Sequence, residues 1–248
     1  MLRKVPSRLD NQLINGSLIS PTPNNRTAQN LVFEMVHIIS NTSMDGELSD
    51  ALAQHGQLLC DTYNAPHRVY HSIYHIAHLF TMAKEFKPFI NDWKHFVAAI
   101  LYHDFVYELD EAVLHNEQNS AKQAEKFLRE LNLHEFESYV VEDMILNSGN
   151  AFDVQLFHDL DHLVLASSKT DYQTYTSAIR QEYGKKHSQK NITLGRLDFC
   201  RKLLKNGPIY RTHICQMRFE KNAYRNLCRE MEELLAEVET RKLEIPVA

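Results

Sequence analysis

Apolar residues recur at spacings of three and four along most of this 248-residue chain. That period places them on one face of an α-helix. The first stripe begins near Thr27, and the longest runs from about residue 217 to residue 241. Between them the pattern predicts helices at about 48–62, 67–86, 93–104, 116–131, 134–147, 155–165, 170–183 and 193–205. No segment alternates as a strand would, so the chain is predicted to be all-α.

The pattern also predicts how the chain is organised into domains. Residues 1–26 are polar and contain three prolines, so we expect a flexible N-terminal segment there. Residues 27–248 are expected to form a single helical domain, because no repeat or change of composition marks a second one. The helix predicted at 93–104 is nearly all apolar and should therefore be buried on most sides.

Composition and charge make several classes of protein less favoured. The low count of 7 Gly and 7 Pro favours helices over hairpins, and 44% hydrophobic content is ordinary for a globular protein. A net charge of −5 without a basic run disfavours nucleic-acid binding. No apolar window predicts a membrane span, and the N-terminus does not resemble a secretory signal. The four well-separated cysteines are typical of reduced thiols in a cytoplasmic protein.

Histidine is the unusual residue, because six of the 14 fall between residues 67 and 104. In the predicted helix His71 and His75 are four residues apart and share a face. Imidazole pairs at this spacing bind divalent metal ions. Two histidines with ordinary hydrogen bonds would show the same short pattern, so this pair alone does not identify a site.

Acidic residues beside apolar segments supply further candidate ligands. His103 and Asp104 follow the most apolar helix, where a carboxylate must be exposed, paired or metal-bound. A helix end that reaches solvent explains them equally well. Asp159 and Asp161 adjoin another apolar stretch, where an aspartate also serves as a helix N-cap. Together these motifs offer nitrogen and oxygen donors from three helices, a donor set that suits a divalent ion.

The order of these motifs resembles that of the HD-domain superfamily of metal-dependent phosphohydrolases. The segments that carry the resemblance are HRVYHSIYHI, LYHDFVYELDEAVLHNEQNSA, FHDLDHLVL, YTSAIRQEY and GRLDFCRKLLKNGPIY. They look like a family of uncharacterised bacterial members, from about residue 28 to residue 236. The YHxxxH element is also similar to that of class I cyclic-nucleotide phosphodiesterases. The resemblance implies a single helical bundle of HD type.

The resemblance also implies roles for individual residues. The implied ligands of a divalent metal ion are His75, His103, Asp104 and Asp161, with Asp159 as the second choice for the last position. His71 would be the general acid. Asn147 and Asn150 stand where related sequences tend to show Thr and His, so a second metal position there should be weakened or absent. His162 stands where the family usually has an apolar residue, and it is an extra ligand or a solvent-facing histidine.

Two further residues are candidates for catalysis. Arg68, expected one turn before His71, is the best positive partner for a phosphoryl group, although a surface ion pair is an equal alternative. Glu117 matches an acidic position of the family and would order the metal-bound water or hold a ligand histidine. Its alternative role is to complement the dipole at a helix N-terminus.

The leading interpretation is a metal-dependent phosphohydrolase that cleaves a phosphate ester of a small molecule, for example a nucleotide, with metal-activated water. The alternative is a catalytically weak HD-type module that binds a ligand or regulates, which Asn147 and Asn150 favour. A helical interaction protein with incidental histidines is a third interpretation. The substrate stays open, as does the metal among Mn, Fe, Co, Ni, Zn and Mg. The long C-terminal helix is compatible with a homodimer and equally with packing inside one chain.

Overall fold

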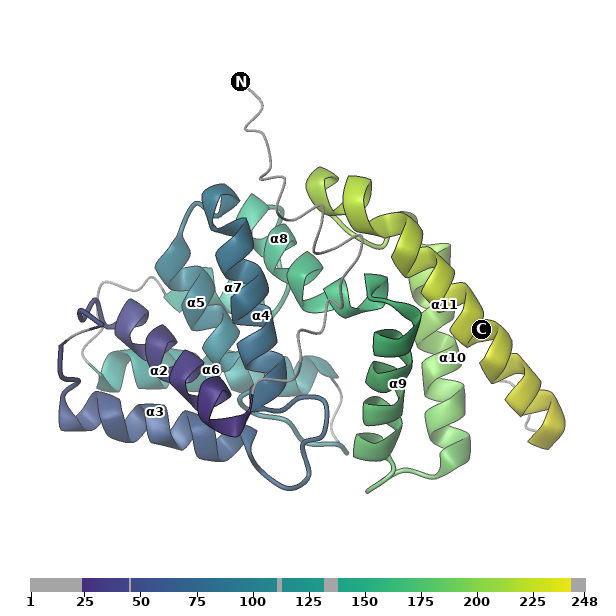
Figure 1. Cartoon of the computed structure of the whole chain (residues 1–248), viewed down its shortest axis with the longest axis horizontal. Helices are drawn as coiled ribbons and strands as arrows, with labels where there is room; N and C mark the ends of the chain where they lie inside the picture. The colour runs from purple at the N-terminus through teal and green to yellow at the C-terminus, as the bar shows by residue number, and fades with distance from the viewer. Residues whose placement is uncertain (1–23, 45, 111–112, 132–137, 242–248) are drawn as a thin grey trace. The chain divides into compact units, whose positions relative to one another are not determined.

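The computed structural model describes residues 24–44, 46–110, 113–131 and 138–241. Over these residues the chain forms ten α-helices and two short 3-10 helices and contains no strand, so the all-α prediction is confirmed (Figure 1). None of the described helices combines the length and apolar character that crossing a membrane requires. Most of the N-terminal segment expected at 1–26 lies outside the described residues, and the first described helix already begins at Asn25.

The contacts divide the chain into two compact units, where the sequence pattern predicted one domain. The first unit ends at Leu160 and the second begins at Asp161, the last residue of helix α8. The helices of the first unit are α2 (Asn25–Ile39), α3 (Asp50–Tyr63), α4 (Ile73–Phe86), η1 (Lys87–Phe89), α5 (Trp93–Tyr102), α6 (Val113–Glu130), α7 (Ser138–Ile145) and α8 (Phe152–Asp161). Those of the second are η2 (His162–Ala166), α9 (Lys169–Tyr183), α10 (Gln189–Lys205) and α11 (His213–Arg241).

Helix α5 is the centre of the first unit. Every residue from His95 to Tyr102 is buried, and the helix packs against α2, α4, α6 and α7. A helix that is apolar on all sides is expected in such a position, so the predicted burial is confirmed. Because α5 ends inside the unit, the next two residues, His103 and Asp104, are held against its core.

Helix α4 begins at Ile73, so the prediction of one helix from residue 67 is wrong. Residues 67–72 form turns and bends instead. The carbonyl oxygen of His71 accepts a hydrogen bond of 3.1 Å from the guanidinium of Arg68, and the amide of His75 donates to Ser72 at 3.0 Å. The helical pattern of hydrogen bonds is therefore absent at His71. His71 and His75 come from a bend and a helix, respectively.

Helix α6 begins at Val113, three residues before the predicted start at residue 116, so Asn116 lies inside the helix. Its side-chain amide accepts a hydrogen bond from the backbone N–H of Glu108 at 3.0 Å and donates to the carbonyl of the same residue at 2.9 Å. The asparagine thus fastens the loop that follows α5 to the side of α6. The predicted start of the next helix, near residue 134, lies outside the described residues.

A buried ion pair organises the second unit. The guanidinium of Arg196 in α10 donates to both carboxylate oxygens of Glu230 in α11, at 2.9 and 2.7 Å. The hydroxyl of Tyr172 in α9 donates to the same carboxylate at 2.6 Å. These hydrogen bonds supply the partners that buried charges need, and they connect α9, α10 and α11 with one another.

One buried histidine of the first unit is far from the candidate ligands in sequence. Nε2 of His55 in α3 lies 2.7 Å from the hydroxyl of Tyr102 in α5. Its ring packs 4.5 Å from the ring of Phe127 in α6, measured between centroids. Burial lowers the pKa of His55 from 6.5 to about 4, because the charged imidazolium is poorly solvated there.

We therefore expect the free energy of unfolding to fall as the pH is lowered from about 6.5 to about 4. In this range the unfolded chain binds a proton at His55 that the folded chain does not bind. With about 1.4 kcal/mol for each pKa unit, the full loss is about 3 kcal/mol. Urea unfolding of wild type and of His55→Gln at pH 7 and pH 5 measures the part of this loss that occurs above pH 5, about 2 kcal/mol, with His213→Gln, at an exposed position, as the control. A His55→Gln variant with the wild-type pH dependence would contradict the assignment.

Candidate metal centre

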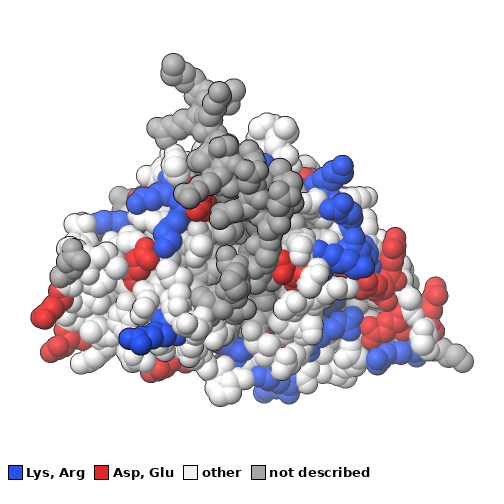
Figure 2. All heavy atoms as spheres, viewed as in Figure 1, with Lys and Arg blue, Asp and Glu red and all other residues white. Residues whose placement is uncertain are grey.

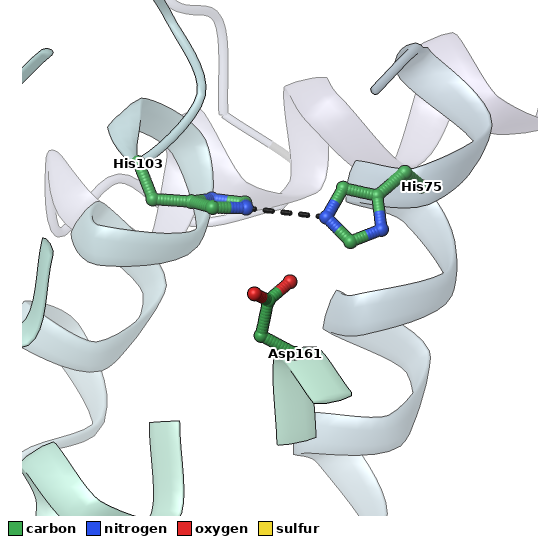
Figure 3. A group of neighbouring side chains, drawn as sticks. All are labelled: His75, His103 and Asp161. Carbon is green, nitrogen blue, oxygen red and sulfur yellow. Dashed lines mark hydrogen bonds between the residues drawn. The ribbon is translucent and has the colours of Figure 1, made fainter. Parts of the chain in front are cut away.

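Two histidine rings face each other where α4 begins and α5 ends. His75 lies in the first turn of α4, and His103 follows the last residue of α5. Both are buried, and their Nε2 atoms are 3.2 Å apart (Figure 3). Nδ1 of His103 donates a hydrogen bond of 3.1 Å to the carbonyl of Ile100, one turn earlier in α5. Because a carbonyl only accepts, this bond assigns the proton of the neutral ring to Nδ1 and leaves the lone pair on Nε2.

The carboxylate of Asp161 joins this pair from the end of α8. One oxygen of Asp161 and one ring nitrogen from each of His75 and His103 all lie within 4.8 Å of one another (Figure 3). The three residues are about 30 and 60 positions apart along the chain, and three different helices bring them together. They form the group of His, Cys, Asp and Glu side chains among the described residues that can hold a metal ion.

Asp104 lies beside the two histidines. Its Oδ2 is 3.1 Å from Nε2 of His103 and 3.6 Å from Nε2 of His75. Burial by itself raises the pKa of the Asp104 carboxyl, but the positive charges of His103, His71 and His75 and a hydrogen bond to His103 outweigh it. The net effect is a pKa well below the usual range, so Asp104 is ionised at neutral pH.

Lone pairs converge in this arrangement. Nε2 of His103 faces the Asp104 carboxylate at 3.1 Å, and the Asp161 carboxylate is near by. This nitrogen carries a lone pair when the ring is neutral and donates a hydrogen bond to Asp104 when the ring is protonated. Acceptors at such short separation repel each other unless a proton or a cation lies between them. Two imidazoles and two carboxylates form a donor set that first-row divalent ions accept.

The spacing of the two ring nitrogens also fits a shared ion. Nitrogens that bind one ion at about 2.1 Å each lie roughly 3.0–3.4 Å apart when the angle at the metal is about 90–109°. The observed separation of 3.2 Å between His75 and His103 lies in this range. The bond from His103 to Ile100 is the kind of outer contact that orients a metal-binding histidine.

His71 is close to this group although it precedes α4. Its ring centroid is 6.0 Å from that of His75, and its ring stacks on Tyr107 at 4.2 Å. The side chain is partly exposed, and its charge contributes to the lowered pKa of Asp104. The sequence pattern could not predict that Tyr107 lies at the site, because Tyr107 and His71 both lie in irregular segments without helical periodicity.

Arg68 is buried and makes three hydrogen bonds to backbone carbonyls. One amino group donates to His71 at 3.1 Å and to Asp104 at 2.8 Å, and the other donates to Phe105 at 2.8 Å. The sequence pattern predicted a helix at Arg68, but the residue precedes α4. Its guanidinium connects the bend before α4 with the segment after α5.

The structure distinguishes the two distal aspartates. Asp159 is fully buried and lies 3.9 Å from Nδ1 of its neighbour His158, outside the group that Asp161 joins. Two helical positions separate them by about 200°, so they point in different directions. His162 lies 3.7 Å from Asp161, measured between Nδ1 and Oδ2, and is partly exposed.

The remaining candidates lie outside the three-residue group. Glu117 is partly exposed on α6, five residues into the helix. Asn147 follows α7 with a φ of 52°, a left-handed conformation that asparagine adopts more readily than most residues. This backbone role gives a structural reason for an amide at position 147. Asn150 is exposed two residues before α8.

Comparison of the chain with family models, curated proteins and solved structures gives no match.

We expect the chain to bind about one divalent ion through the group of His75, His103 and Asp161. Substitution of any of the three by Ala should weaken binding at least about 100-fold, because each removes a direct donor. The measurement is calorimetric titration of chelator-treated protein with Mn²⁺ and Zn²⁺, together with metal analysis. His78→Ala, on the next turn of α4 and outside the group, is the matched control. Equal loss in the control, or no loss in Asp161→Ala, would contradict the assignment.

Proposed function

We propose that the chain is a metal-dependent phosphohydrolase that cleaves a phosphate ester of a small molecule. The observation that carries the proposal is the convergence of His75, His103 and Asp161, with Asp104 beside them. The order of these residues in the sequence supports it, because it resembles the order of the HD-superfamily motifs. The donor set also supports it, since imidazole and carboxylate together suit the divalent ions that assist phosphoryl transfer.

A divalent ion at this position would supply a bound water of lowered pKa and a Lewis acid for a phosphoryl oxygen. The chain itself contributes orientation and charge. Ile100 holds the ring of His103 so that Nε2 points to the site, and Asp104 contributes a negative charge next to both imidazoles. With Asp161 the group carries two carboxylates, which offset the charge of a dication in a largely buried position.

His71 is the residue that we propose as general acid. It is partly exposed, so a leaving group can reach it, and its ring lies beside that of His75. Imidazole changes protonation near neutral pH, as proton donation to a leaving oxygen requires. Stacking on Tyr107 restricts the ring, and Arg68 holds the backbone that carries it. In this proposal Arg68 is a positioning residue instead of the phosphate ligand that the sequence suggested.

A second candidate function is a ligand-binding or regulatory module with little turnover. It is favoured by Asn147 and Asn150, which occupy the positions where the resembled family tends to have Thr and His. Metal binding is common to both functions, so it does not distinguish them. A test for hydrolysis of phosphomonoesters, nucleotides or cyclic dinucleotides with Mn²⁺, Mg²⁺, Co²⁺ or Ni²⁺ distinguishes the enzyme from the binding module.

The roles of His71 and His75 should separate by substitution. His75→Ala should lose metal and activity together, because it removes a direct donor. His71→Ala should keep the metal and slow hydrolysis of an alkyl phosphate by about 10²–10⁴-fold, the usual contribution of a general acid. For nitrophenyl phosphate, whose leaving group needs no proton, the loss should be much smaller.

Metal content and initial rates on an alkyl and an aryl phosphate are the measurements for both variants. Loss of the metal from His71→Ala would make His71 a ligand instead of an acid. Full activity of His71→Ala on the alkyl ester would exclude the proposed proton donation. A wild-type protein that binds metal but hydrolyses none of the substrates would favour the binding module.

A further inference from the structure

Helix α11 has a second apolar stripe besides the one that packs into its own unit. The inward stripe consists of residues buried in the second unit: Cys215, Phe219, Ala223, Asn226, Leu227, Glu230, Leu234 and Val238. The outer stripe consists of residues that are exposed or partly exposed: Ile214, Met217, Tyr224, Cys228, Met231 and Leu235. Met217 and Tyr224 are the most open, with 74% and 55% of their surface exposed. A helix that packs only against its own unit needs one apolar stripe, so the outer stripe of α11 calls for another explanation.

The outer stripe has the spacing of a coiled-coil seam. From Ile214 to Leu235 its members are separated by three and four residues in alternation, with Lys221 filling the one polar position. This is the pattern of the two core positions of a heptad, and it continues for about three heptads. α11 has 29 residues and is therefore about 43 Å long, enough for such a seam.

Charge along α11 is divided between its two halves. Residues 213–229 contain four basic residues and one acidic residue, whereas residues 230–241 contain five acidic residues and one basic residue. Figure 2 shows acidic side chains gathered around the C-terminal half of the helix, with basic side chains before them. This order opposes the helix dipole, which favours anions at the N-terminus and cations at the C-terminus. Glu230 and Glu237 are paired with Arg196 and Arg180 inside the unit, so the acidic residues that face outward are Glu232, Glu233 and Glu239. For these the order is unfavourable within one helix.

An antiparallel copy of the same helix removes this disadvantage. It places the basic half of each helix against the acidic half of the other, and it covers the C-terminal part of both outer stripes. We propose that two copies of this chain form a homodimer through the outer stripes of antiparallel α11 helices. The inference concerns a surface outside the candidate metal centre and stands independently of the proposed function.

The residues beside the seam specify the register. Arg225 and Glu232 are both exposed and occupy the same flanking heptad position, one heptad apart. In antiparallel pairs equivalent flanking positions of the two helices meet, so Arg225 of each copy lies against Glu232 of the other. The two-fold axis then passes between positions 228 and 229, in the C-terminal half of the outer stripe. A parallel pair would not bring these two residues together.

The first measurement is the mass of the full chain in solution, by sedimentation velocity from about 1 to 100 µM at low and high salt. We expect a dimer whose dissociation constant increases with salt, because exposed ion pairs are screened. A chain that stays monomeric over this range overturns the proposal. So does a Tyr224→Glu variant that dimerises as wild type does, because Tyr224 is exposed and lies where the two stripes overlap.

Charge reversal then tests the orientation. Arg225→Glu and Glu232→Arg each replace two attractive pairs in the dimer by two repulsive ones, and each should weaken it at least about 10-fold. The double variant R225E/E232R should recover most of the wild-type affinity. Within one helix these residues are about 10 Å apart along the axis, so recovery cannot come from a pair inside one chain.

Lys202→Glu, at an exposed position of α10, is the control for net charge and should leave the dimer unchanged. Circular dichroism verifies that all variants fold. A double variant as weak as the single variants, or a control as weak as they are, overturns the antiparallel arrangement.

Discussion

The guanidinium of Arg68 connects the two segments on which the candidate site depends. It donates to the carbonyls of His71, Asp104 and Phe105, and two of these follow the last turn of α5. Carbonyls near a helix C-terminus lack partners within the helix, and a cation there also complements the dipole. A buried arginine in turn requires acceptors. The two amino groups of Arg68 find their acceptors at one place, which holds the bend before α4 next to Asp104.

The same end of α5 explains why polar groups collect inside an apolar unit. α5 is buried along its length, so the residues that follow it begin in a poorly solvated environment. His103 is satisfied on one side by the Ile100 carbonyl, and Asp104 is kept ionised by the neighbouring imidazoles. Burial strengthens these interactions because little water screens them. Nε2 of His103 and the carboxylates of Asp104 and Asp161 are therefore held close together at this end of α5.

The second unit uses charge in two different ways. Inside it, Arg196 and Glu230 are paired and also bound by tyrosine hydroxyls, which links α9, α10 and α11. A network of this kind supplies partners for its own buried charges. On the outer side of α11, charge is instead divided between the halves of the helix and accompanies an apolar stripe. That arrangement has its natural complement in a second, antiparallel helix.

The sequence by itself determined the helical class, the number and approximate limits of most helices, the burial of α5 and the residue types of the candidate site. These properties depend on local periodicity, because apolar residues at three and four spacings define helices and their buried faces. Tertiary structure decided where α4 begins, since the His71 carbonyl bonds to Arg68 instead of to an amide four residues later. It also decided that Asn116 binds the loop at Glu108, and that Asp161 rather than Asp159 meets His75 and His103. Each of these outcomes depends on which groups from distant segments lie within hydrogen-bonding distance, and periodicity along the chain carries no information about that distance.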